Sequence, residues 1–144
     1  MIRKLKKSDF KEYLNLMRGF RKIEEVTKQV FIERYDLIFK SGEIWVVIDD
    51  DKICGSITIF FDYKFINNFG VVGHIEDVFV HKNYRKKGYG SLLINKAIEL
   101  CKDKSCYKVS LVCNESSKNF YRKNGFIENE YQMVYFICND LKKW

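Results

Sequence analysis

A basic segment with two glycines, R-K-K-G-Y-G at residues 85–90, carries the residue types that bind phosphate groups. A segment predicted to be a buried strand, residues 74–80, precedes it, and an amphipathic helical pattern over residues 89–103 follows it. A helix that begins here presents unpaired N–H groups of its first turn, where the helix dipole favours negative charge. The glycines let an anion approach the backbone and the cations add charge-assisted contacts, so the segment predicts a diphosphate site.

The spacing matches neither of the two better-known phosphate loops. Both G-x-x-x-x-G-K-[ST] and G-x-G-x-x-G with an acid after the next strand are absent. Taken alone, the segment is equally compatible with a solvated turn that caps a helix. Its interpretation therefore depends on the elements around it.

Hydrophobic periodicity and turn residues predict two helices, then a hairpin, then strands alternating with helices. We expect helices over residues 8–20, 27–41, 89–103 and 115–123, and strands over residues 2–6, 43–48, 53–61, 74–80, 107–113 and 131–137. The turn at residues 49–52 joins two of these strands, and residues 64–70 form a loop. This order predicts an α/β (α+β) fold with a mixed sheet.

Length and composition limit the function classes. The 144 residues predict one domain, and no apolar run approaches the ~20 residues of a membrane span. Without an apolar signal region at the N-terminus, we expect a cytoplasmic protein. The net charge of +7 favours anionic partners, and its dispersal among acids favours phosphorylated small molecules over nucleic acid. The odd number of cysteines without C-x-x-C spacing predicts reduced core residues rather than disulfides or a metal site: Cys54, Cys101, Cys106, Cys113 and Cys138.

A second motif lies at residues 114–126, where N-E-S-S-K-N-F-Y-R-K-N-G-F fits N-x-x-[AS]-x-x-F-Y-x-x-x-G-F. With the basic loop upstream, it resembles the closing motif of GNAT-superfamily acetyltransferases. Residues 63–66, 74–78 and 106–109 are similar to the glucosamine-6-phosphate N-acetyltransferase family. The resemblance implies one GNAT domain over residues 1–144, with a mixed, mostly antiparallel sheet whose central strands splay between flanking helices.

The resemblance also implies acetyl-CoA as cosubstrate and no metal. Pantetheine would lie between the strands at residues 75–80 and 107–113, pairing with backbone groups, and the diphosphate would meet the helix N-terminus. The cofactor-binding residues implied are Val78, Phe79, Val80, Arg85, Lys86, Lys87, Gly88, Tyr89, Gly90, Ser91, Asn114 and Tyr121.

Three side chains and one backbone N–H group are implied in catalysis. Glu76 would accept the proton of the acceptor ammonium, directly or through water, and Asp77 would face the acceptor. Tyr121 would protonate the departing thiolate, and the N–H of Val78 would stabilise charge on the carbonyl oxygen. Two alternatives stay open: Tyr121 only packs beside its aromatic neighbours, or one of the two adjacent carboxylates faces solvent. Direct transfer needs no acyl-enzyme, which leaves Cys113 as a packing residue.

The acceptor implied is glucosamine 6-phosphate, bound by Lys64, Phe65, Ile66, Asn67, Glu76, Asp77 and, hypothetically, Arg21. Arg21 is included because the family's usual arginine for the sugar phosphate is Phe136 here, and the acid usual before Cys113 is Val112. These departures keep open a GNAT enzyme acting on a polyamine, an aminoglycoside or a protein N-terminus. A non-catalytic acyl-CoA-binding regulator or a nucleic-acid-binding module are alternatives of another class. The family pairs as homodimers, so we also expect a homodimer.

Overall fold

The computed structural model describes residues 1–137, and its centre is a five-stranded sheet in the order β1-β2-β3-β4-β5. The strands are β1 (Ile2–Lys4), β2 (Gly42–Asp49), β3 (Lys52–Tyr63), β4 (Val71–Val80) and β5 (Cys106–Leu111). Neighbouring strands run antiparallel except β4 and β5, which run parallel. The sheet is therefore mixed, as the order of elements predicts.

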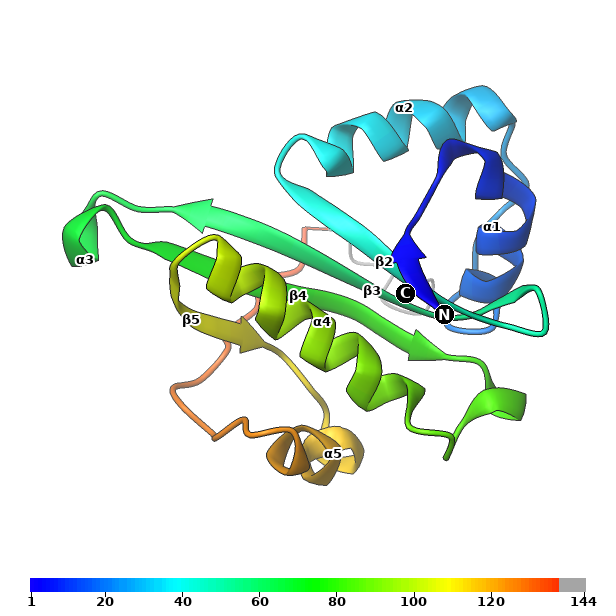
Figure 1. The fold of residues 1–144 in the computed structure, drawn as a ribbon. Coiled ribbons are helices and arrows are strands. Elements are labelled where there is room, and N and C mark those ends of the chain that lie inside the picture. The colour runs from blue at the N-terminus through cyan, green and yellow to red at the C-terminus, as the bar shows by residue number, and fades with distance from the viewer. Residues whose placement is uncertain (138–144) are drawn as a thin grey trace.

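Helices cover both faces of this sheet (Figure 1). On one face lie α1 (Phe10–Arg18), which follows the 3-10 turn η1 (Lys7–Asp9), and α2 (Lys28–Phe39). On the other lies α4 (Tyr89–Asp103), which follows the 3-10 turn η2 (Lys82–Tyr84). The short α3 (Ile66–Phe69) forms the tip of the long β3–β4 hairpin, and η3 (Glu115–Ser117) leads into α5 (Lys118–Lys123). Two apolar clusters, one on each face, hold the layers together.

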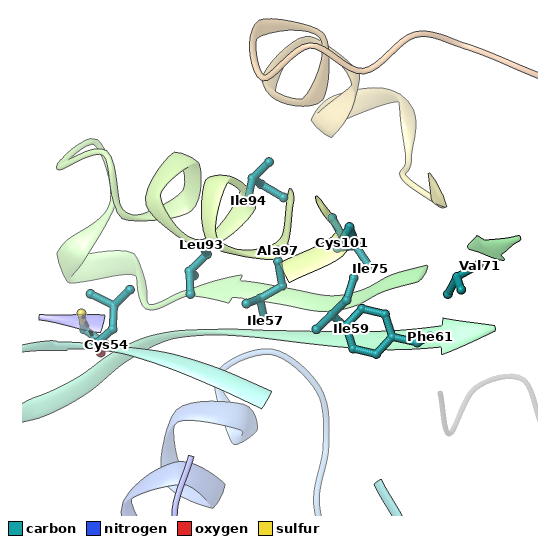
Figure 2. Packing of buried hydrophobic residues seen from close by; sticks show 11 residues of the cluster. Cys54, Ile57, Ile59, Phe61, Val71, Ile75, Leu93, Ile94, Ala97 and Cys101 are labelled. Atoms are coloured by element: carbon teal, nitrogen blue, oxygen red, sulfur yellow. Dashed lines mark hydrogen bonds between the residues drawn. The ribbon is translucent and has the colours of Figure 1, made fainter. Parts of the chain in front are cut away.

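The apolar stripe of α4 explains how this helix packs. Leu93, Ala97 and Cys101 are buried facing β3 and β4, and Ile94 is buried on the side of α4 that points away from these strands (Figure 2). Gly73 of β4 admits Cys101, because a Cβ at Gly73 would lie 2.3 Å from the Cys101 Sγ. Close packing along its whole length fixes the N-terminus of α4 relative to the end of β4.

Several expected boundaries are wrong. Residues 131–137 form no strand: their side chains are largely exposed, and the sheet of one chain ends at β5. The strand expected from residue 74 begins at Val71, and that expected through residue 113 ends at Leu111. Cys54 and Cys101 are buried as expected, but Cys106 is half-buried and Cys113 is exposed, because β5 ends before Cys113. The remaining cysteine, Cys138, lies outside the described residues.

Candidate active site

A β-bulge interrupts β4 at the centre of the sheet. The register of β3 against β4 shifts between Ser56 and Thr58. Two residues of β4, Asp77 and Val78, stand opposite the single residue Ile57, which is the arrangement of a bulge. Asp77 has a positive φ of 49°, a conformation that is uncommon for residues other than glycine. The bulge re-aims the side chains that follow it.

The bulge also decides where the two adjacent carboxylates lie. Glu76 pairs with Thr58, and the Thr58 side chain lines a cavity of about 150 Å³ between the sheet and helices α1 and α2. Asp77 lines the same cavity, although strict alternation would put neighbours on opposite faces. Partial burial raises the pKa of Glu76 above its usual value, and the charge of Asp77 raises it further. A carboxyl group with a raised pKa is better suited to accept a proton near neutral pH.

Strands β4 and β5 separate beside this bulge. Their last parallel pair joins Ile75 to Leu111, where β5 ends, whereas β4 continues to Val80. Beyond that pair, the β5-facing edge of residues 76–80 has no strand partner within residues 1–137. Backbone groups on such an edge can pair with an extended ligand. The expected splay of the central strands is confirmed, and Val78, Phe79 and Val80 lie on its open edge.

The basic segment forms a tight turn at the N-terminus of α4. Lys86 and Gly88 have positive φ angles of 64° and 82°. Helix α4 makes its first backbone hydrogen bond from the Leu92 N–H to the Gly88 carbonyl, at 3.0 Å, so the N–H groups of residues 89–91 have no partner within the helix. A Cβ at Gly88 would meet no atom within 4 Å, so the space before the turn is open. This geometry fits a diphosphate.

Asp49, at the end of β2, anchors this turn. Its Oδ2 atom accepts a hydrogen bond from the Tyr89 hydroxyl at 2.8 Å and one from the Lys87 ammonium at 3.0 Å. Lys87 and Tyr89 are predicted cofactor residues, but their side chains hold the turn against the β2–β3 hairpin. The sequence reasoning missed Asp49, whose only local sign is its place in a run of three aspartates.

Two further predicted cofactor residues are also partly engaged within the protein. The Nε atom of Arg85 donates to the carbonyl of Val80 at 3.0 Å, which ties the turn to the end of β4. The side-chain oxygen of Asn114 accepts from the backbone N–H of Ser117 at 3.0 Å and caps η3. The side chains of Arg85 and Asn114 each keep further N–H donors for a ligand, since a guanidinium and an amide group carry several N–H bonds.

Tyr121 lies in α5, whose neighbouring residue Phe120 packs against the N-terminus of α4. A Cβ at Gly90 would come within 3.0 Å of the Phe120 ring. The Tyr121 ring makes edge contacts with Phe120 and Phe126, at centroid distances of 5.0 and 6.0 Å. Burial raises the pKa of the Tyr121 phenol, and Cys113 raises it further. The phenol is therefore protonated at neutral pH, and its packing fixes the ring without using the hydroxyl.

The comparisons with known proteins agree with this geometry. Residues 8–126 match the acetyltransferase (GNAT) family. The chain belongs to this family. The glucosamine 6-phosphate N-acetyltransferase 1 of Dictyostelium discoideum is 37% identical over 118 residues, covering 77% of this chain and 74% of that protein. The Trypanosoma brucei brucei glucosamine 6-phosphate N-acetyltransferase is 33% identical over 135 residues, covering 92% of each. The crystal structure of the Arabidopsis thaliana glucosamine-6-phosphate N-acetyltransferase superposes with a TM-score of 0.90 at 31% identity, covering 96% of this chain and 98% of that chain.

In this GNAT chain the predicted acceptor residues are not all close to the carboxylates. Lys64 follows β3, and residues 65–67 belong to the exposed tip of the hairpin, which projects beyond α4 (Figure 1). Val71, the first residue of β4 after the tip, is five residues from Glu76, or roughly 17 Å along a strand. One chain therefore brings Glu76 and Asp77 together but leaves residues 65–67 apart from them.

A row of polar side chains leads from the hairpin toward Glu76. The Lys64 ammonium lies 2.5 Å from the Oδ2 atom of Asp62, and the Nε2 atom of His74 lies 3.5 Å from the same oxygen. The Nδ1 atom of His74 is 2.9 Å from the hydroxyl of Ser110 on β5. His74 precedes Glu76 by two positions, so both side chains stand on one face of β4.

Arg21 and Arg18, near the end of α1, differ in their surroundings. The Arg21 guanidinium lies 4.6 Å from the centroid of Phe20, which stacks on Phe79 of β4 at 5.2 Å. Arg18 instead pairs with Glu25 at 3.3 Å. Arg21 therefore lies against an aromatic pair that includes Phe79, a residue of β4 after the bulge, whereas Arg18 is held by an ion pair.

Three residues beside the bulge were missed by the sequence reasoning: Tyr13, Ser56 and Thr58. Ser56 and Thr58 are the only polar or charged side chains that are buried in the described part of the chain, with exposed fractions of 0% and 4%. The Ser56 hydroxyl donates to the Tyr13 hydroxyl at 3.4 Å. Their sequence signal is two hydroxyl residues at alternate positions of an otherwise apolar strand, C-G-S-I-T-I at residues 54–59.

Proposed function

We propose that this GNAT protein transfers the acetyl group of acetyl-CoA to the amine of glucosamine 6-phosphate. The relatives at 37% and 33% identity carry this activity in their names. The observation that carries the proposal is the bulge at Asp77, which puts two carboxylates beside an open strand edge that leads to the N-terminus of α4. We further propose that residues 1–144 act as a single acetyltransferase domain.

Several groups of the chain would hold acetyl-CoA. The N–H groups of residues 89–91, the open space at Gly88 and the cation of Lys86 fit its diphosphate. The backbone edge from Val78 to Val80 fits its pantetheine amides. When bound, acetyl-CoA supplies a thioester whose carbonyl carbon an amine can attack. We assign the proton transfers of this attack to side chains of the protein.

Glu76 would act as the base. Its raised pKa brings the carboxylate closer to the range in which it can take a proton from an ammonium group. Val78 would donate its N–H to the carbonyl oxygen as negative charge develops there, because a bulge leaves one N–H of the strand outside the ladder. Tyr121, kept protonated by burial, would give its proton to the thiolate sulfur. The acetyl group is not bonded covalently to the protein at any step of this reaction.

The phosphate of the acceptor requires a cation, because Phe136 stands in the position of the family's usual arginine. We propose Arg21 for this contact, supported by its place against the aromatic pair of Phe20 and Phe79. The Arg21→Glu variant should raise KM for glucosamine 6-phosphate about tenfold and leave KM for acetyl-CoA within twofold. An equal rise in both constants would remove Arg21 from the acceptor site.

A homodimer would explain two exposed apolar regions. The hairpin tip exposes Phe65, Ile66 and Phe69 at 88%, 68% and 73%, and the C-terminal segment exposes Tyr131 and Met133 at 97% and 93%. Large exposed apolar groups of this kind mark contact surfaces. A second copy would cover them and bring the tip residues Phe65, Ile66 and Asn67, with Lys64, to an acceptor site. Sedimentation of the purified protein should give a dimer, whereas a monomer at working concentration would refute this arrangement.

The proposed product, N-acetylglucosamine 6-phosphate, is a precursor of nucleotide-activated N-acetylglucosamine, and the reaction would belong to the cytoplasm. Free-thiol release with a panel of amines tests the acceptor. Glucosamine 6-phosphate should give at least a hundredfold higher kcat/KM than spermidine, an aminoglycoside or an N-terminal peptide. Val112 and Phe136 favour another amine as the second candidate, and activity on such an amine without activity on the sugar phosphate would establish it.

A further inference from the structure

The two buried hydroxyl residues of β3 bracket the bulge of β4. Thr58 pairs with Glu76 before the bulge, and Ser56 pairs with Phe79 after it. Both side chains are buried on the face covered by α1, while Ile57 between them packs on the opposite face. The buried polar groups of the sheet are thus concentrated at the one place where the β3–β4 ladder is irregular.

One residue of α1, Tyr13, lies beside both Ser56 and Thr58. The Tyr13 side chain is 8% exposed, and its hydroxyl accepts a hydrogen bond from Ser56 at 3.4 Å. Thr58 lines the same cavity as Tyr13. Burial raises the pKa of Tyr13, and these two hydroxyls act against that rise while the charge of Asp77 adds to it. Tyr13, Ser56 and Thr58 form one hydroxyl cluster, and Asp77 lines the same cavity as Tyr13 and Thr58.

Buried hydroxyls in an apolar layer are costly unless they are paired, so their positions are mutually constrained. If the bulge were lost, β4 would shift by one residue on one side of it. Such a shift turns side chains to the other face of a sheet. Tyr13 bonds to Ser56 and shares a cavity with Thr58, so it lies against β3 on both sides of Ile57, the residue opposite the bulge.

We propose that the hydroxyl cluster of Tyr13, Ser56 and Thr58 is a positioning device that holds the bulge and thereby aims the Val78 N–H and the Asp77 carboxylate. The inference rests on the proposed acetyl transfer, because the Val78 N–H and the Asp77 carboxylate have their roles in that reaction. Tyr13 of α1 is buried, so its effect would pass through the backbone of β3 and β4.

The test compares Tyr13→Phe with Tyr35→Phe, a matched control that also removes a tyrosine hydroxyl from the helical layer. The Tyr35 hydroxyl donates to the Leu5 carbonyl at 2.9 Å and has no hydrogen bond to Ser56 or Thr58 in the described part of the chain. Tyr13→Phe should lower kcat about tenfold, keep KM for acetyl-CoA within twofold and speed amide hydrogen exchange over residues 76–79. Tyr35→Phe should change neither kcat nor that exchange.

Position 58 offers a second comparison in case Tyr13→Phe folds poorly. Thr58→Ser keeps the hydroxyl and should retain wild-type kcat, whereas Thr58→Val loses it and should behave like Tyr13→Phe. Equal kcat values for Thr58→Ser and Thr58→Val would overturn the positioning role. Unchanged amide hydrogen exchange over residues 76–79 in Tyr13→Phe would overturn it as well. If the wild-type protein acetylates no amine, the proposed function is wrong. The hydrogen-exchange data would still show whether the hydroxyl cluster holds the bulge.

Discussion

Ile75 and Phe79 are both on β4, yet Ile75 packs under α4 and Phe79 packs under α1, on opposite faces of the sheet. Residues separated by an even number of positions share a face in a regular strand. The bulge at Asp77 and Val78 lies between them and accounts for the change of face. The same irregularity puts Asp77 at the cavity lined by Thr58, the partner of Glu76, so the candidate active site depends on a feature of strand pairing.

Tyr121→Phe should lower kcat by roughly a hundredfold and leave KM for acetyl-CoA nearly unchanged, because it removes a proton donor without removing the ring. Burial raises the pKa of Tyr121, so the wild-type rate should fall only as the pH rises through that raised value. The variant should lack this alkaline limb. Steady-state kinetics across pH checks both expectations, and a wild-type kcat in the variant would leave Tyr121 with a packing role only.

The acidic limb of the pH profile should report Glu76. Since burial and the charge of Asp77 raise the pKa of Glu76 above 4.5, kcat/KM should rise with pH through a midpoint above that value. Asp77→Asn removes the neighbouring charge and should move the midpoint to lower pH. Glu76→Gln should abolish the limb and most of the activity. A midpoint that stays fixed in Asp77→Asn would show that Glu76 is not the titrating base.

Gly88→Ala should destabilise the protein by about 1–2 kcal/mol, the cost of a left-handed backbone for a residue with a Cβ. The cost is conformational, because φ is 82° and a Cβ would meet no atom within 4 Å. KM for acetyl-CoA should rise severalfold as the turn changes shape. Gly88→Asn is the matched control, since asparagine tolerates this conformation better. Equal denaturation midpoints for the two variants would contradict the backbone argument.

Asp9→Asn should lower stability by roughly 1 kcal/mol at neutral pH. Desolvation of Asp9 acts to raise its pKa, but two hydrogen bonds from Arg3 at 2.7 and 3.0 Å and one from the Lys6 N–H leave it below 3.8. The carboxylate therefore stabilises the fold fully above pH 3.8, and this contribution disappears as pH falls through the lower native pKa.

Urea denaturation of wild type and Asp9→Asn at pH 7 and at progressively lower pH checks this expectation. The two proteins should converge in stability at low pH. Asp36→Asn serves as control, because the Lys7–Asp36 pair at 2.6 Å is about half exposed on both sides and should contribute under 1 kcal/mol. A difference between wild type and Asp9→Asn that is constant with pH would contradict the assigned pKa shift.

Local patterns in the sequence predict the elements that depend on local interactions. Helix α4 spans the expected residues because its apolar stripe and the glycine at its start are both local signals. The hairpin of β2 and β3 and the cap of α2 at Thr27 follow in the same way, and the Thr27 side chain accepts from the Val30 N–H. The turn at residues 85–88, before α4, could therefore be placed from the sequence.

The features that the sequence reasoning missed depend on partners far along the chain. The bulge arises from the pairing of β4 with β3, and local alternation at Glu76 and Asp77 gives no sign of it. Asp49 and Tyr13 reach their partners from distant elements. Residues 131–137 are rich in aromatic and aliphatic residues, which is typical of a strand, but the sheet of one chain offers them no partner within residues 1–137.

A crystal structure of the protein with CoA and N-acetylglucosamine 6-phosphate tests the proposed site most directly. We predict that the diphosphate contacts the N–H groups of residues 89–91, that pantetheine pairs with Val78 to Val80, and that the amide nitrogen of the sugar lies within reach of Glu76. CoA bound away from the opened edge of β4, or the sugar on the far side of the sheet from Asp77, would contradict the account.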